Sequence, residues 1–381
     1  MVRRVLLWFH RYLGLLATIP LILLGLSGAV LVFEVEIDRA LNPTYWNVSP
    51  QGERMAWQDV VRAVSKAYPH DAVTGIRFPE KPTVAAEVSL KSGLSLGVDP
   101  YTGRVLGARR RGKAITTYIH QFHTRLLSGI WLRSKTDWGG RITGFSTIAM
   151  LVLAITGLIL WWRRKSFGIK WNAPWRRVIF DAHYAFGFWG MLPLLFIGLT
   201  GVAIGFEGVI RPALYSMTQS HPAPMPDMHS AKASGPRLSI DAALGVAHQA
   251  LPGAEVSNLG LPTSPSGVFL AFMKFPEDHT PAGRSRVGMD QYSGKILWLE
   301  NARTSPAGTR LFNLGRPIHT GDIFGWPTRI LACLASLALV AQAMSGLWLW
   351  WPRGRRGAGQ PDITAQPAGE LAPSAQPDRA T

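Results

Sequence analysis

The sequence contains a single cysteine, Cys333, among 381 residues. One thiol cannot form an intramolecular disulfide, and it excludes Cys-ligated iron–sulfur clusters and multi-cysteine structural zinc sites. The sequence also lacks a Cys-x-x-Cys-His motif, which excludes covalent attachment of a c-type haem. Stability and any cofactor binding must therefore come from other side chains.

Charged residues are absent from four long runs, at residues 12–33, 142–162, 184–206 and 330–351. Each run has about the 20 residues that an α-helix needs to cross the hydrocarbon core of a bilayer. The runs predict a polytopic α-helical membrane protein with four transmembrane helices. Aromatic side chains typical of the headgroup level cluster at their ends: Trp8, Tyr12, Trp161, Trp162, Trp348, Trp350 and Trp351.

The first run follows Arg3 and Arg4, as the apolar part of a signal peptide does. No small-residue cleavage site follows it, because the run continues into Phe33-Glu34. A similar run lies in mid-chain, where no signal peptide can lie. We therefore expect the first run to remain as a transmembrane helix.

The chain has 23 Asp and Glu but 40 Lys and Arg, giving a net charge of +17. Basic residues lie before the first run, between the second and third runs, and after the fourth. Under the positive-inside rule these three places are cytoplasmic, so both termini are predicted to be cytoplasmic. No basic soluble domain is evident, so nucleic acid is not an expected partner. The residues are Arg3, Arg4 and Arg11, then Arg163, Arg164, Lys165, Lys170, Arg176 and Arg177, then Arg353, Arg355 and Arg356.

The two halves of the sequence resemble each other. HRYLGLLATIPLILLGLSG, from His10, aligns without a gap with HYAFGFWGMLPLLFIGLTG, from His183. TGLILWWRR (156–164) aligns with SGLWLWWPR (345–353), and VDPYTGRVLG with MDQYSGKILW. Such self-similarity predicts a duplicated unit. Both halves run in the same direction, so a pseudo-two-fold axis along the membrane normal is expected.

The predicted fold is four transmembrane helices in two parallel repeats, with two small α+β domains on the periplasmic side. Helical periodicity followed by strand alternation predicts each α+β domain. The tail is rich in Pro, Ala and Gly and is expected to be disordered. The expected segments are 1–33 (first span), 34–118 (first domain), 119–164 (outer histidine segment and second span), 165–182 (cytoplasmic loop), 183–206 (third span), 207–311 (second domain), 312–352 (outer histidine segment and fourth span) and 353–381 (tail).

Four histidines occupy equivalent positions in the two halves. His10 and His183 begin the first and third spans at the cytoplasmic side, and His123 and His319 precede the second and fourth spans at the extracytoplasmic side. We expect each pair to meet across the pseudo-two-fold axis. An interfacial histidine with its polar tip among the headgroups is the alternative for each one. Preservation of both pairs through a duplication favours a role as ligands.

Two facing neutral imidazoles suit the axial positions of a haem. Zinc usually takes three or four ligands, and no Asp or Glu lies within the spans. His120 shares a helix face with His123 and is an alternative outer ligand. Gly14, Gly25, Gly28 and their counterparts leave room either for close helix packing or for a macrocycle.

Two further groups are weaker candidates. His221, Met225, Met228 and His229 lie in the segment 221–235 and could bind a soft or borderline metal, although the segment also fits a solvated linker. Five arginines flank the outer histidines and fit headgroup anchors, partners of haem propionates or substrate-binding residues: Arg125, Arg133, Arg141, Arg316 and Arg329.

These motifs resemble those of the PepSY-associated transmembrane family. The matching segments include WFHRYLGLLATIPLILLGLSG, both hairpins and IHTGDIFG…SGLWLWWPR, and the resemblance covers about residues 5–355. Within the family the chain is most similar to inner-membrane ferric-siderophore reductases of the ferrioxamine type. The resemblance implies two periplasmic PepSY domains, b-type haems (two in this chain) held by His, and electron transfer to iron in a ferric siderophore.

Some relatives carry a fused flavin reductase module that this sequence does not show, so the expected electron donor is an unidentified partner, either a cytoplasmic reductase or a quinol. The expected function is reduction of Fe(III) in hydroxamate-type ferric siderophores to Fe(II), which releases the iron. One alternative is a non-enzymatic PepSY binding or regulatory protein. A siderophore or metal permease is the other, but the spans offer only Gln342 and scattered Ser and Thr as midplane polar groups.

Overall fold

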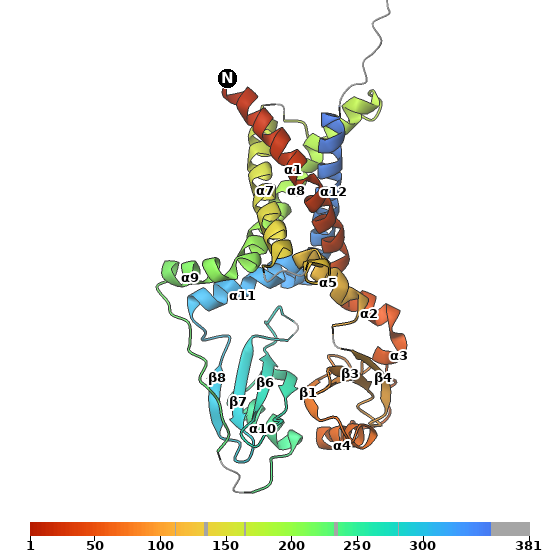
Figure 1. Cartoon of the computed structure of the whole chain (residues 1–381), viewed down its shortest axis with the longest axis vertical. Helices are drawn as coiled ribbons and strands as arrows, with labels where there is room; N and C mark the ends of the chain where they lie inside the picture. The colour runs from red at the N-terminus through yellow and green to blue at the C-terminus, as the bar shows by residue number, and fades with distance from the viewer. Residues whose placement is uncertain (111, 133–135, 164, 232–234, 281, 352–381) are drawn as a thin grey trace, which may run out of the picture.

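A computed structural model describes residues 1–110, 112–132, 136–163, 165–231, 235–280 and 282–351. Its helix bundle contains four helices that are long and apolar enough to cross a membrane, which confirms the four predicted spans. A β-sheet lies below one end of the bundle, and the N-terminus lies at the opposite end (Figure 1). These ends are called the sheet end and the far end. The four helices are α1 (Val2–Leu31), α7 (Trp138–Trp162), α8 (Trp175–Gly205) and α12 (Trp326–Trp350). The predicted tail, 353–381, lies outside the described residues.

The bundle is held by apolar and small side chains where the helices cross. A central cluster contains Ala17, Leu21, Met150, Leu194, Ala335 and Leu339. Gly25 of α1 lies so close to α12 that an added Cβ would be 2.7 Å from Val340 and 2.8 Å from the Ser336 carbonyl oxygen. Gly25 therefore serves helix packing, the first of the two roles that the sequence allowed for these glycines.

The strands form one eight-stranded antiparallel sheet in the order β4-β3-β2-β1-β5-β6-β7-β8. Two segments, one from each half of the chain, supply four strands each. They join through β1 and β5, where Gly75, Ile76 and Arg77 pair with Gly260, Leu259 and Asn258. The sequence predicted strands in two separate domains, and the structure places them in a common sheet. The strands are β1 (Val73–Arg77), β2 (Ala86–Leu90), β3 (Leu94–Val98), β4 (Val105–Arg110), β5 (Glu255–Gly260), β6 (Val268–Lys274), β7 (Ser285–Asp290) and β8 (Ile296–Glu300).

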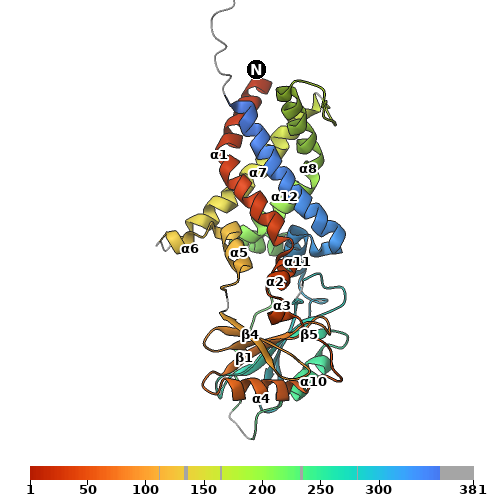
Figure 2. The ribbon, with the colours of Figure 1, turned by 90° about the vertical axis from the view of Figure 1, so that its right-hand side faces the viewer.

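Two helices, α4 (Trp57–Ala67) and α10 (Ile240–Ala250), pack on the sheet on the side away from the bundle (Figure 2). Each helix caps the first turn of the other. The Asp241 carboxylate accepts hydrogen bonds from the backbone N–H groups of Trp57 and Gln58, and the Gln58 side-chain oxygen accepts one from Ile240 N–H. These bonds satisfy N-terminal donors that have no partner within their own helix.

Shorter helices connect the sheet to the bundle (Figures 1 and 2). Arg329, near the start of α12, joins them to the long helices: its guanidinium donates to the Val32 carbonyl oxygen and to both carboxylate oxygens of Glu36. The hydrogen bonding between Arg329 and the Glu36 carboxylate is the main cause of the lowered pKa of Glu36. The connecting helices are α2 (Glu34–Leu41), α3 (Pro43–Trp46), α5 (Ile115–Arg125), α6 (Ser128–Trp131), α9 (Glu207–Met217), α11 (Ala307–Thr320) and the 3-10 helix Asp322–Phe324.

Candidate metal centres

The far-end pair consists of His10 on α1 and His183 on α8. Their ring centroids are 6.5 Å apart, and their planes are nearly perpendicular, at 85°. Nδ1 of His10 lies 2.8 Å from the Thr156 hydroxyl on α7, and Nδ1 of His183 lies 2.9 Å from the Ser345 hydroxyl on α12. Each imidazole is therefore oriented by a hydroxyl on a neighbouring long helix.

The sheet-end pair consists of His123 on α5 and His319 on α11, with ring centroids 6.3 Å apart. Nδ1 of His123 lies 2.9 Å from the Ser27 hydroxyl on α1. Nδ1 of His319 lies 3.2 Å from the Thr200 hydroxyl on α8 and 2.9 Å from the Ile197 carbonyl oxygen. The structure thus brings together both histidine pairs that the sequence matched.

Each hydroxyl also lies within hydrogen-bonding distance of a backbone carbonyl of its own helix, and this contact bears on the ring tautomer. A hydroxyl that donates to its carbonyl accepts from the imidazole. In that arrangement Nδ1 carries the ring proton and Nε2 keeps its lone pair, which is the state of a histidine ready to bind a metal. The hydroxyl-to-carbonyl bonds are Thr156 to Val152, Ser345 to Gln342, Ser27 to Leu23 and Thr200 to Phe196.

A glycine follows every one of these hydroxyl residues. Gly157, Gly346, Gly28 and Gly201 leave the imidazole Cε1 atoms of His10, His183, His123 and His319 only 3.3, 3.4, 3.3 and 3.1 Å from where a Cβ would lie. A larger residue would push the ring away from its hydroxyl. We call each Ser/Thr-Gly dipeptide a cradle. These dipeptides align between the two halves of the sequence, but the sequence gives no sign of their contact with the histidines.

Burial among the helices lowers the pKa of His123 to about 4 and also lowers the pKa of His319. Both imidazoles are therefore neutral at physiological pH. A neutral imidazole is the form that binds metal ions.

Two imidazoles at each centre supply two ligands. Two nitrogens that bind one first-row metal at about 2 Å each place their ring centroids about 6 Å apart, close to the spacing in both pairs. Among the described residues, no group of three or more His, Cys, Asp or Glu side chains is placed to hold a metal ion. Further ligands would have to come from a cofactor, such as the four nitrogens of a planar macrocycle.

His120, the alternative outer ligand, contacts a different partner. Its Nδ1 lies 3.7 Å from a carboxylate oxygen of Glu34, and half of its side chain is exposed. His123, three residues later, faces His319 instead. The geometry therefore favours His123 over His120 as the member of this pair.

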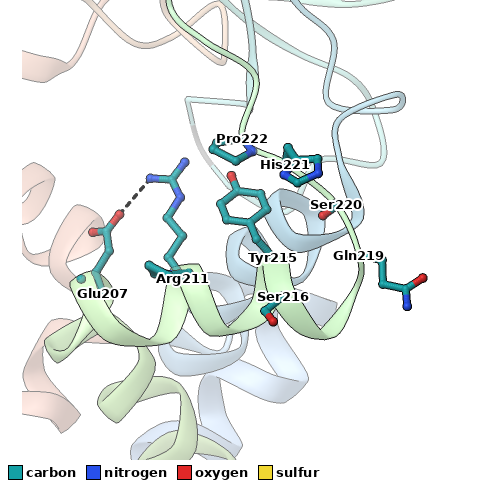
Figure 3. A pocket seen from close by; sticks show the side chains of 10 residues that line it. Glu207, Arg211, Tyr215, Ser216, Gln219, Ser220, His221 and Pro222 are labelled. Carbon is teal, nitrogen blue, oxygen red and sulfur yellow. Dashed lines mark hydrogen bonds and ion pairs between the residues drawn. The ribbon is translucent and has the colours of Figure 1, made fainter.

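The residues of segment 221–235 have separate contacts. The Met228 sulfur packs against Gly288 of the sheet, and His229 pairs with Asp227 at 3.0 Å. Met225 is exposed. His221 lines a hollow of about 880 Å³ that runs along α9 (Figure 3). These contacts give no support to a metal site in this segment.

Hydrogen bonds beside that hollow attach α9 to α11, the helix that carries His319. The Ser220 hydroxyl accepts from Gly308 N–H, and the hydroxyls of Tyr215 and Thr309 are 2.8 Å apart. On α9 itself, Arg211 and Glu207 form an ion pair at 3.0 Å (Figure 3).

The arginines flanking the sheet-end pair differ in their partners. Arg329 donates hydrogen bonds to the Glu36 carboxylate and to the Val32 carbonyl oxygen. Arg125 forms an ion pair with Asp137 at 3.2 Å, and the Arg141 guanidinium lies over the Trp138 ring. Arg316 is exposed. Arg133 lies outside the described residues. Arg329 thus has a structural role and is not placed to bind a propionate or a substrate.

The family model of the PepSY-associated TM region matches residues 7–353, which include both pairs and all four cradles. The chain belongs to the PepSY-associated transmembrane family. No curated protein sequence matches the chain significantly. Membership of this family agrees with four apolar helices combined with a separate antiparallel sheet.

Proposed function

We propose that this protein is a two-haem reductase of a bacterial inner membrane that passes electrons outward to ferric siderophores. The order of elements supports two parallel repeats: α1, α4, β1–β4, α5 and α7 in one half, and α8, α10, β5–β8, α11 and α12 in the other. The basic residues near the far end make that end cytoplasmic and both termini cytoplasmic, with the sheet in the periplasm. The far-end pair is then the inner centre, and the sheet-end pair is the outer centre.

The observation that carries the proposal is the state of the four imidazoles. Each Nδ1 is within hydrogen-bonding distance of a hydroxyl, and each imidazole packs against a glycine. The ring centroids of each pair have the separation of two imidazoles that bind one metal. His10 with His183, and His123 with His319, would each hold one haem b through their Nε2 atoms. The haem would supply the remaining ligands and a reversible one-electron couple.

The spacing of the two centres suits transfer across a membrane. Ser27, which holds His123, lies 17 positions after His10 on α1, and Thr200 lies 17 positions after His183 on α8. At the rise of an α-helix this separates the two levels by about 25 Å, most of the thickness of the hydrocarbon core. The chain's own residues keep each imidazole neutral, oriented and surrounded by helices.

The chemical step is a one-electron reduction of the substrate iron. An Fe(III) siderophore complex receives one electron, and the product is Fe(II) and the free siderophore. Hydroxamate oxygens are hard ligands that hold Fe(III) much more tightly than Fe(II), so the reduced iron is released. The electron comes from a cytoplasmic reductase or a quinol at the inner centre.

A single-turnover experiment tests this function. The purified protein is reduced, freed of excess reductant, and mixed with a ferric hydroxamate siderophore and a ferrous chelator. We expect the haem to reoxidise while the chelator traps Fe(II). His319→Ala should abolish this reaction, and His120→Ala should retain it. If the reduced protein ignores the siderophore but passes electrons to a quinone, the reductase proposal is wrong.

A further inference from the structure

Among the described residues, Gln342 of α12 is the one polar side chain in hydrogen-bonding contact with an Nε2 atom of the four histidines. Its amide nitrogen lies 3.4 Å from Nε2 of His183. In the tautomer with the proton on Nδ1 of His183, the amide N–H donates and Nε2 accepts. In the part of the chain that the structure describes, the Nε2 atoms of His10, His123 and His319 have no hydrogen-bond partner.

The other half of the chain has a leucine at the equivalent position. Leu153 precedes Thr156 by three residues, as Gln342 precedes Ser345. Both side chains cover the glycine that lies one turn after an inner histidine. Leu153 lies 3.8 Å from a Cβ placed on Gly14, and the Gln342 amide nitrogen lies 2.8 Å from one placed on Gly187. An apolar side chain therefore fills the same space without loss of packing.

The glutamine is unfavourable where it lies. Its side-chain oxygen is buried and has no hydrogen-bond partner in the part of the chain that the structure describes. A buried acceptor without a donor is destabilising, and a polar side chain within a membrane span usually has a functional role. Packing alone does not explain why one half has Gln and the other has Leu.

We propose that Gln342 competes with the metal for the Nε2 lone pair of His183, so that the inner centre has one weakened axial position. This inference rests on the proposed function, because it takes His183 as a haem ligand. In the metal-free protein the amide holds the imidazole in its ligating tautomer. Whenever His183 leaves the metal, the same amide stabilises the detached ring. In the other half of the chain Leu153 stands at the equivalent position, so His10 has no such competitor among the described residues.

The competition has a defined size and direction. A neutral hydrogen bond contributes enough net stability to change an equilibrium about fivefold. Gln342→Leu should therefore raise the affinity of the inner centre for haem about fivefold. It should lower by a similar factor the affinity of the reduced protein for carbon monoxide, which binds where His183 has detached.

The experiment uses the full-length protein in detergent. Haem-depleted wild type, Gln342→Leu, Gln342→Met and Leu153→Gln are titrated with haemin, and the reduced forms are titrated with carbon monoxide. Methionine has the unbranched shape of glutamine without its amide. The methionine variant therefore separates the effect of losing the amide from that of a packing defect in the leucine variant. Leu153→Gln is the reciprocal control and should weaken haem binding and favour carbon monoxide binding, because it places an amide beside His10.

Unchanged affinities in both Gln342 variants would overturn the inference. So would tighter carbon monoxide binding in them, or a Leu153→Gln protein that binds haem more tightly than wild type. The proposed function would survive those results, because wild type would still bind two haems. If wild type binds no haem, both the function and the inference are wrong.

Discussion

Nδ1 of His319 lies 2.9 Å from the carbonyl oxygen of Ile197 on the neighbouring helix. A carbonyl oxygen only accepts, so this contact holds the ring in its ligating tautomer even without Thr200. Among the described residues, the Ser27 hydroxyl is the one group in hydrogen-bonding geometry with His123 Nδ1. Burial lowers the pKa of His123, and the Leu24 carbonyl, a weaker backbone partner, opposes that shift. The two imidazoles of the outer centre therefore depend differently on their cradles.

We predict that Ser27→Ala weakens haem binding at the outer centre more than Thr200→Val does. Loss of a hydrogen-bond partner behind a metal ligand typically costs about 10- to 100-fold in metal affinity, and Ser27→Ala should fall in this range. Thr200→Val should cost less, because Ile197 still accepts the proton of His319. Haemin titration of the two variants measures the difference. Equal losses would show that Ile197 does not support His319 as described.

Single histidine substitutions should separate the two centres. His10→Ala or His183→Ala should remove the inner haem, and His123→Ala or His319→Ala the outer one, because in the proposed function each pair holds one haem. Haem content per chain should fall from two to one in every case, with different residual spectra for the two groups. His120→Ala is the matched control on α5 and should keep both haems, since its imidazole pairs with Glu34. Loss of the same haem from all four variants would rule out two sites.

A methyl group added to a cradle glycine should displace the imidazole above it. An alanine Cβ at position 201 would lie 3.1 Å from Cε1 of His319 and 3.3 Å from the Thr147 methyl group, so the ring is confined from two sides. We expect Gly201→Ala to weaken outer haem binding without unfolding the chain. Gly205→Ala on the same helix is the control, because apart from the neighbouring helix backbone no described atom lies within 4 Å of the added Cβ. Normal outer haem in Gly201→Ala would argue against the cradle.

The Glu36–Arg329 ion pair predicts a pH-dependent contribution to stability. Its partner Arg329 lowers the pKa of Glu36, so the stabilisation is present above the ordinary Glu pKa and is lost as pH falls through the lowered value. Asp322 and Arg39 are the other charged groups near this pair. Glu36 is 39% exposed, so solvent screening keeps the effect modest.

Thermal unfolding of wild type and Glu36→Gln between pH 7 and pH 3 measures this contribution. The variant should be less stable than wild type at pH 7 and should approach it at low pH, where Glu36 is protonated in both states of wild type. A difference between the two proteins that does not shrink on acidification would contradict the assignment.

The transmembrane helices and the matched histidines could be predicted because both depend on local patterns. Uncharged runs mark the spans, and a gap-free alignment marks His10 against His183. Helix ends were less predictable: α8 begins at Trp175, eight residues before the expected start of the third span at His183. Basic residues near a helix end extend their charged groups towards the headgroups, so charge does not mark where the helix begins.

The common sheet and the cradles could not be predicted, because both depend on contacts between distant segments. The pairing of β1 with β5 joins residues more than 180 positions apart, and nothing in either strand alone specifies its partner. Ser and Thr in a membrane helix commonly bond to their own backbone, so Ser27 and Thr156 gave no sign of a histidine beside them. The pairing of Arg329 with Glu36 was likewise hidden by their distance in the sequence.

The haem content and visible spectrum of the purified wild-type protein test the central claim most directly. Protein expressed with ample haem should contain two non-covalent haems per chain with the low-spin spectrum of bis-imidazole ligation. A variant with all four histidines replaced should contain none. A colourless wild-type protein, or haem that persists in the fourfold variant, would contradict the account and leave a PepSY membrane protein without a redox centre at these residues.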